Sequence, residues 1–271
     1  MSSADPIWLA IKLARGVQHL KSINDEVTKL VESEECGIIP DLQSEPGYLV
    51  IKAYMRSAPS PLCSIHVGEA LYQMRSTLDH LVCHLTESNG QVVENKTEFP
   101  IFLKREDFRD DSGNLTRAIR ARIGGILPEH QALIEREQAF QGKYGAAEDD
   151  PLWWLYELSN FDRHHFPHLV GHATLDAHAD ITPQWFADRY FTLQSTNFGA
   201  FEGETEVARY RIDPAANDVT PIVRVQVNSH VSFGIAFGNE GPGAGRPVVS
   251  TLKAIGDRVS RLAAGFFVKG S

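Results

Sequence analysis

Apolar residues recur every three or four positions along two long stretches of the first half of the chain, which is the spacing of one face of an α-helix. The first stretch begins at Asp5-Pro6, an N-cap followed by the preferred first helical residue, and ends near Gly37. The second follows the breaker-rich run 57–61, extends from about Leu62 to Thr86, and stops before Asn89-Gly90. We therefore expect two long amphipathic helices.

Between these helices, residues 48–55 are β-branched and aromatic and predict a strand. Shorter helices are expected over residues 104–109, over residues 115–123 and from Pro128 onward. The pair Asp150-Pro151 repeats the capping signal and predicts a helix that continues to about residue 164.

From about His168 the pattern changes to short alternating runs separated by Asn, Gly, Asp and Pro, which is typical of antiparallel strands. The runs cover residues 190–194, 206–212, 222–227 and 231–237. Pro247 then opens a last amphipathic helix. The sequence predicts an α+β fold, in which a helical N-terminal two-thirds packs with an antiparallel β-meander and a C-terminal helix. We expect one compact unit over residues 1–271: mainly helical over 1–165, strands over 166–245 and a terminal helix over 246–271.

Composition narrows the class of protein. The chain has 271 residues, of which 42% are hydrophobic and 23% are charged, and this excludes disordered and collagen-like proteins. Its three cysteines are far apart and form no C-x-x-C pair, which disfavours a disulfide framework or a zinc ribbon. No basic segment precedes the first apolar stretch, and no window approaches 18 uninterrupted apolar residues. We expect a cytoplasmic protein with no membrane partner.

The net charge of −9 gives the molecule a field that repels phosphate backbones. A nucleic-acid partner would therefore need a local basic patch. Arg117, Arg120 and Arg122 lie within six residues that contain no acid, and they are the candidate nucleic-acid-binding residues. The alternative is that they form a solvated helix face.

Two clusters of polar residues could carry chemistry. On the helix over residues 62–86, Arg75 and Asp79 lie on one flank of the apolar stripe, whereas His80 and His84 lie on the other flank together with His66. His80 and His84 are one turn apart, the spacing with which a helix chelates a metal. The second cluster comprises Asn160, Asp162 and His164.

These two clusters resemble motifs of a widespread family of uncharacterised bacterial proteins, which carry an LRsaLDHL helix and a later N-x-D-K-H segment. The matching segments are Gly68–Val82, Phe99–Ile101 and Trp154–His164, and the resemblance covers roughly residues 5–265. Arg163 stands where the family usually has lysine. The resemblance implies that the following residues occupy the motif positions of a shared site, and they are the candidate catalytic residues: Arg75, Asp79, His80, Asn160, Asp162 and His164.

The spacing Arg75-x4-His80 is also similar to that of the HEPN ribonucleases, in which four to six residues separate an arginine from a histidine on one helix. This resemblance implies a homodimer that cleaves RNA without metal. Arg75 would hold the scissile phosphate, and His80 would transfer a proton at the ribose 2′-hydroxyl.

Three classes of function stay open. The first is a metal-independent, HEPN-like ribonuclease or nucleotide-acting enzyme, without a cofactor and with RNA or a nucleotide as partner. The second is a metal-dependent hydrolase or metal-binding protein that holds zinc or another divalent ion with His80, His84, Asp162 and His164. The third is a non-catalytic binding or interaction protein, in which the polar residues form a buried network.

Both enzyme interpretations require the two clusters to meet. We expect the helix over residues 62–86 to pack against the helix over residues 151–164. Arg75 or His80 should then lie within side-chain reach of the Asn160–His164 segment.

Overall fold

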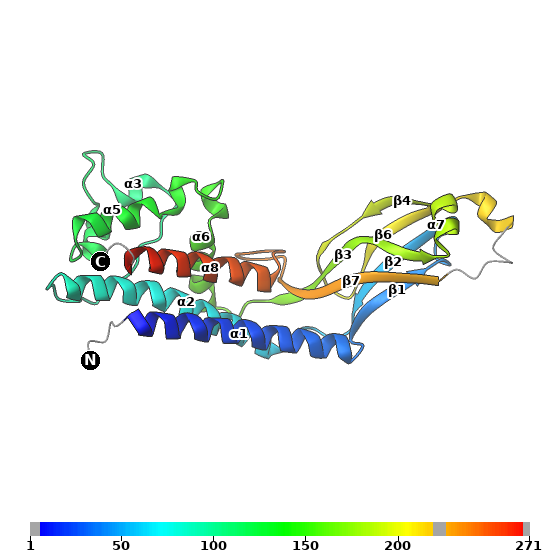
Figure 1. Ribbon diagram of the computed structural model, residues 1–271, viewed down its shortest axis with the longest axis horizontal. Coiled ribbons are helices and arrows are strands. Elements are labelled where there is room, and N and C mark those ends of the chain that lie inside the picture. Colours follow the sequence, from blue (N-terminus) through cyan, green and yellow to red (C-terminus); the bar gives the residue numbers. More distant parts are fainter. Residues whose placement is uncertain (1–5, 219–225, 268–271) are drawn as a thin grey trace. The chain divides into compact units, whose positions relative to one another are not determined.

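The computed structural model describes residues 6–218 and 226–267, in which the helices and strands are as drawn in Figure 1. Two compact units divide the chain. The helical unit comprises residues 1–23, 64–167 and 249–271, and the sheet unit comprises residues 24–63 and 168–248. The single compact unit expected from the sequence stays a prediction. No helix of the described segments has a stretch long and apolar enough to cross a membrane.

The first two long helices of the chain, α1 and α2, lie side by side and antiparallel (Figure 1). The long helices of the chain are α1 (Pro6–Glu32), α2 (Pro61–Ser88) and α8 (Val248–Phe267). Lys12 Nζ of α1 donates a hydrogen bond of 2.9 Å to Ser76 Oγ of α2. Two turns further along α1, His19 lies against His66 of α2. Gly16 faces α2, and a Cβ atom there would lie only 3.8 Å from the Ala70 carbonyl oxygen. A Cβ atom at this position would therefore make ordinary van der Waals contact with α2.

The other helices of this unit are short, and the loops between them are fastened by buried polar side chains. They are α3 (Arg105–Phe108), α4 (Arg117–Ile123), α5 (Pro128–Arg136) and α6 (Pro151–Asp162), with 3-10 turns at Ala139–Gln141 and Ala147–Asp149. Gln138 is buried; its side chain accepts from the Phe102 N–H at 3.0 Å and donates to the Pro100 carbonyl at 2.9 Å. Asp150 caps α6 by accepting from the Leu152 N–H at 2.8 Å, as the Asp-Pro signal predicts.

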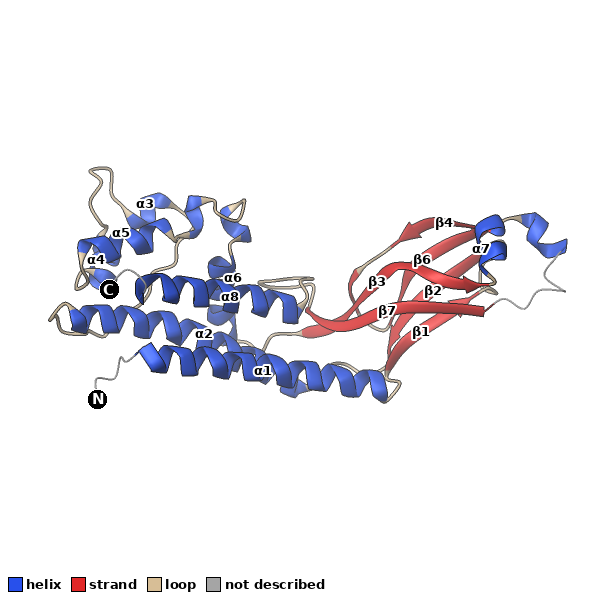
Figure 2. Cartoon of the chain, viewed as in Figure 1, coloured by secondary structure: helices blue, strands red, loops and turns tan. Residues whose placement is uncertain are grey.

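The sheet unit contains two antiparallel sheets, drawn in red in Figure 2. One has the strand order β1-β2-β6-β4 and the other has the order β5-β3-β7. The strands are β1 (Cys36–Asp41), β2 (Tyr48–Met55), β3 (Leu169–Thr182), β4 (Phe191–Thr196), β5 (Gly199–Phe201), β6 (Glu204–Ile212) and β7 (Gln226–Phe237). Helix α7 (Gln184–Tyr190) precedes β4, and a 3-10 turn, η3 (Pro214–Asp218), follows β6. A core cluster draws on both sheets, with Ile51 and Val207 fully buried from the first and Ala173 and Phe201 buried from the second.

The α+β class, the antiparallel strands and the terminal helix are confirmed. The strands do not follow one another in sequence order, because β6 pairs with both β2 and β4 and β3 pairs with β7. Part of the predicted run 222–227 lies outside the described residues.

Several elements of the sheet unit were not predicted, and three of them show the reason. The first is β1, which contains Gly37 and Pro40; it lies at the edge of its sheet, where a strand tolerates proline. The second is β3, in which Gly, His and Asp interrupt the apolar residues. The third is α7, which is only seven residues long and too short to establish a period of 3.6 residues.

Candidate functional site

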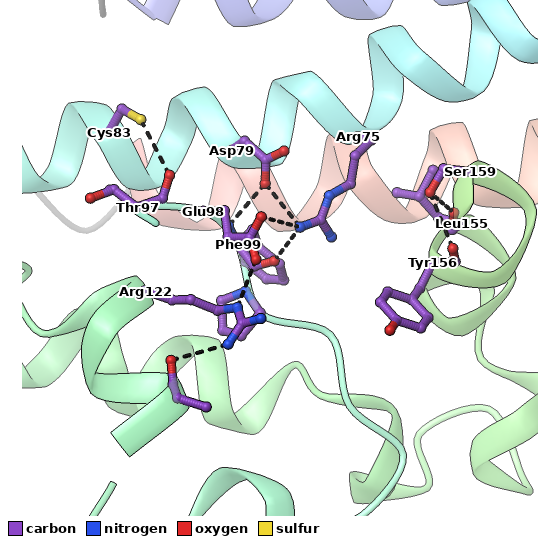
Figure 3. A network of polar contacts seen from close by, with 12 residues as sticks. Arg75, Asp79, Cys83, Thr97, Glu98, Phe99, Arg122, Leu155, Tyr156 and Ser159 are labelled. Atoms are coloured by element: carbon purple, nitrogen blue, oxygen red, sulfur yellow. Dashed lines mark hydrogen bonds and ion pairs between the residues drawn. The ribbon is translucent and has the colours of Figure 1, made fainter. Parts of the chain in front are cut away.

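Arg75 and Asp79 fasten α2 to the extended segment that contains Phe99 (Figure 3). Arg75 Nη2 donates to the Phe99 carbonyl oxygen at 2.7 Å and lies 3.1 Å from Asp79 Oδ1, which in turn accepts from the Phe99 N–H at 2.9 Å. Glu98 extends the network: its Oε2 lies 3.8 Å from Arg75 Nη2, and its Oε1 accepts from Arg122 Nε at 2.7 Å. Apart from the Arg75–Asp79 pair within α2, each of these contacts joins α2 or α4 to the same loop, so the network has a structural role.

Burial raises the pKa of Asp79, and the Arg75 guanidinium and the Phe99 N–H oppose that rise. The Arg75 side chain is 11% exposed, and its Nη1 is buried without a hydrogen-bond partner in the described part of the chain. The guanidinium is therefore directed at protein groups rather than presented to solvent.

Among the described residues, His80 makes no hydrogen bond or ion pair with this network. His80 is exposed. Partial burial of its ring lowers the pKa of His80, and the Lys12 ammonium lowers it further. His84 is half-buried. The predicted metal set of His80, His84, Asp162 and His164 does not assemble, because the one described group with three ligand atoms within 4.8 Å of one another lies elsewhere.

The three arginines of α4 have different surroundings. Arg122 is paired with Glu98, and Arg120 Nη2 donates to the Leu115 carbonyl at 3.0 Å. Arg117 is exposed. Because Glu98 neutralises Arg122, the predicted basic patch keeps two charges that no carboxylate of the described residues compensates.

Asp162 is the residue of the second cluster that meets α2. Its carboxylate lies over Gly68, where a Cβ atom would be 2.5 Å from Oδ1. Arg75 follows Gly68 by seven residues, which is about 10 Å along the helix axis. His164 is exposed just after α6, and Asn160 is half-buried within it. The expected meeting of α2 and α6 thus takes place at Gly68, and Arg75 and Asp162 belong to different surroundings.

A compact cluster of ligand-type atoms lies beside Asp162, where α1 crosses α2. His19 comes from α1, and His66 and Glu69 come from α2, three residues apart and therefore on one face of the helix. His19 Nδ1 lies 3.0 Å from Glu69 Oε2 and 3.4 Å from His66 Nδ1, and His66 Nδ1 lies 3.4 Å from Glu69 Oε2. Two imidazoles and one carboxylate thus converge on a single point.

The three side chains differ in exposure. His19 is buried, at 5% exposed, whereas half of the Glu69 side chain is exposed. Burial lowers the pKa of His19, and the Glu69 carboxylate opposes that shift. The lowered pKa favours the neutral form of the His19 ring, which can bind a metal ion through Nδ1 once the proton on that nitrogen is released.

A cavity of about 500 Å³ opens beside this cluster. Asp162 lines it together with His19 and Glu69, and burial raises the pKa of Asp162. Among the described residues Asp162 has no hydrogen-bond or ion-pair partner. The remaining lining side chains are one cation, one amide and three apolar or aromatic groups: Arg15, Gln73, Ile65, Tyr72 and Phe166. The cavity thus combines possible metal ligands, an unpaired carboxylate and a positive charge.

Sequence reasoning found part of this cluster. It placed His66 on the polar flank of α2, but it did not pair His66 with Glu69, although a His-x-x-Glu spacing on a helix is a readable signal. His19 had no local signal, because its place depends on which face of α1 meets α2.

Comparisons with known proteins give no family assignment. No family model, no curated protein and no solved structure matches the chain. The resemblances to the bacterial LRsaLDHL family and to the HEPN ribonucleases stay predictions. The geometry of the site is therefore the basis for a functional proposal.

Proposed function

We propose that this protein is a metal-dependent hydrolase, with a divalent transition-metal ion bound by His19, His66 and Glu69. The triangle formed by the two Nδ1 atoms and Glu69 Oε2, with edges of 3.0, 3.4 and 3.4 Å, carries this proposal. Zinc binds imidazole nitrogen and carboxylate oxygen at about 2.0–2.2 Å in a tetrahedral arrangement. Tetrahedral geometry at that bond length separates neighbouring ligand atoms by about 3.3–3.6 Å. The triangle therefore has close to the size of one face of a tetrahedral site.

The ligand set favours a catalytic site over a structural one. Catalytic zinc sites commonly use three protein ligands, including two histidines with one glutamate, and leave the fourth position to water. The cavity beside Glu69 gives that position access to a substrate. A bound ion would lower the pKa of its water to about 7 and so supply hydroxide at neutral pH.

Asp162 has a role in this proposal as a proton acceptor. It lines the same cavity and has no described partner, so it is free to accept a hydrogen bond from the metal-bound water. When the water oxygen attacks the substrate, Asp162 would take the released proton and later return it to the leaving group. Arg15 would hold a negatively charged part of the substrate. The reaction class is hydrolysis of an ester, amide or phosphoester of a small molecule.

The metal-independent ribonuclease interpretation has less support. It needs Arg75 to face a phosphate, whereas Arg75 Nη2 donates to the Phe99 carbonyl and pairs with Asp79. His80 is exposed, and it lies five residues, or about 140°, around the helix from Arg75. Arg75 is therefore better explained by its contacts with the loop than by catalysis.

Metal analysis of matched variants tests the proposal. Wild-type protein purified without added metal should contain close to one equivalent of zinc, manganese or iron, or should take up one equivalent on titration. His19→Ala and His66→Ala should lose that equivalent because each removes one ligand. His80→Ala is the control, since it truncates an exposed histidine on α2 outside the triangle, and it should keep the metal.

Activity distinguishes a hydrolase from a metal-binding protein. The loaded protein should hydrolyse members of a panel of chromogenic esters and phosphoesters, and Asp162→Asn should slow hydrolysis while leaving metal content unchanged. A wild-type protein that binds no metal at micromolar concentrations would overturn the proposal, as would His66→Ala protein with full metal content. Bound metal without hydrolysis on any panel member would remove the catalytic part alone.

A further inference from the structure

A row of polar side chains crosses three adjacent strands of the sheet unit. Arg211 of β6 lies directly opposite Tyr48 of β2 on one side and Thr192 of β4 on the other. Directly opposite residues in neighbouring strands point to the same face of a sheet, so the three side chains form one row. The row lines a cavity of about 390 Å³, and Arg189, near the end of α7, lines it as well. Two guanidinium groups and two hydroxyl groups therefore share one concave surface.

The charge of this surface is only partly compensated. Arg209, two residues before Arg211 on the same face of β6, is fully engaged: its Nε and Nη2 donate to Glu206 at 2.9 and 2.6 Å, and its Nη1 donates to Glu45 at 2.5 Å. Within the described segments, by contrast, Arg189 and Arg211 have no carboxylate within ion-pair distance. Neighbouring arginines of one sheet face thus differ, since one is locked in ion pairs and the other is open to a ligand.

One carboxylate also lines the cavity. Asp213 follows β6, and its Oδ1 accepts from the Ala215 N–H at 2.8 Å, which holds the side chain in a turn. Two arginines and one aspartate leave a net positive charge. The cavity consequently favours a ligand that offers an anionic group to the arginines and a hydroxyl donor to Asp213.

We infer that this cavity binds a small phosphate monoester that also carries hydroxyl groups, such as a sugar phosphate. Guanidinium groups form paired hydrogen bonds with phosphate oxygens, and a phosphate monoester has enough terminal oxygens for Arg189, Arg211 and the Thr192 hydroxyl. The volume suits a small molecule. The site is confined to the sheet unit and is separate from the proposed metal centre, so either can exist without the other.

Calorimetric titration with ribose 5-phosphate tests the inference, and ribose and inorganic phosphate serve as partial ligands. Wild-type protein should bind ribose 5-phosphate more tightly than inorganic phosphate and should not bind ribose. Arg211→Ala should weaken binding at least tenfold, and Arg211→Lys should restore little of it, because lysine keeps the charge but loses the paired geometry. Arg117→Ala is the control for net charge: it removes an exposed arginine of the helical unit and should leave binding unchanged.

Amide chemical shifts locate the site independently of the variants. Ribose 5-phosphate should shift the backbone amide signals of Thr192 and Ile212 in the wild-type protein and leave those of α2 unchanged. Absence of binding at millimolar ligand would overturn the inference. So would equal weakening by Arg117→Ala and Arg211→Ala, or shifts confined to the helical unit.

Discussion

Replacing Gly68 with alanine places a methyl group where the Asp162 carboxylate now lies. The new Cβ atom would be 2.5 Å from Oδ1 and 2.6 Å from Oδ2, whereas non-bonded carbon and oxygen atoms normally stay more than 3 Å apart. The carboxylate must therefore move by most of an ångström. Gly68→Ala thus displaces Asp162 from its observed position without changing Asp162 itself.

Two opposing effects set the stability of this variant. Alanine in a helix interior is better than glycine by about 0.5–1 kcal/mol. Overpacking typically costs about 1–3 kcal/mol, and the low end applies because a half-buried carboxylate can rotate. The net change in the free energy of unfolding should be between about zero and 2 kcal/mol of destabilisation. Gly16→Ala is the matched control: its Cβ would meet nothing closer than 3.7 Å, so it should stabilise the protein by the full helix term.

Urea unfolding of a double-mutant cycle isolates the contact. In the Asp162→Ala background the obstructing carboxylate is absent, so Gly68→Ala should stabilise the protein by about 0.5–1 kcal/mol, as Gly16→Ala does. The coupling free energy between positions 68 and 162 should then be at least about 1 kcal/mol. A coupling below about 0.5 kcal/mol would refute the close approach of α6 to α2 at Gly68, and with it the placement of Asp162 in the cavity.

Three further predictions concern other parts of the molecule. Arg75→Ala should lower the free energy of unfolding, measured in urea, by about 2–3 kcal/mol, because Asp79 and the Phe99 carbonyl lose the guanidinium as a partner. Arg120→Ala is the control and should change it by less than about 0.5 kcal/mol. The pKa of His19 is lowered in the folded state, so its contribution to stability is full above pH 6.5 and is lost as pH falls toward the folded pKa. Urea unfolding with EDTA between pH 8 and pH 5 should show this loss in wild-type protein and a smaller loss in His19→Gln protein. Burial raises the pKa of Cys63 to about 11, so native protein at pH 8 should resist alkylation there until urea unfolds it; rapid native alkylation would contradict the burial.

The helices could be predicted largely from the sequence because their signals are local. The apolar stripe and the breakers around the second helix gave residues 62–86, and α2 covers Pro61–Ser88. Asp150-Pro151 marked the start of α6 to the residue. The order of the strands could not be predicted in this way, since β2 pairs with β6 across some 150 residues of intervening chain.

The candidate site shows the same division between local and distant information. Asp162 and His66 stood out because each lies in a polar group on a helix. The partner of His66 on α1 depends on how two helices meet, and no local pattern in the sequence shows this. Arg75 and Asp79 were expected to be catalytic, and their contacts with Phe99 depend on a loop whose path has no periodic signal.

X-ray absorption spectroscopy of the zinc-loaded protein tests the proposed centre most directly. The account predicts a first shell of nitrogen and oxygen atoms at about 2.0–2.1 Å, with outer-shell scattering from two imidazole rings that falls to one ring in His66→Ala protein. His80→Ala protein should give the wild-type spectrum. A first shell with sulfur at about 2.3 Å, or a spectrum without imidazole scattering, would contradict a centre built from His19, His66 and Glu69.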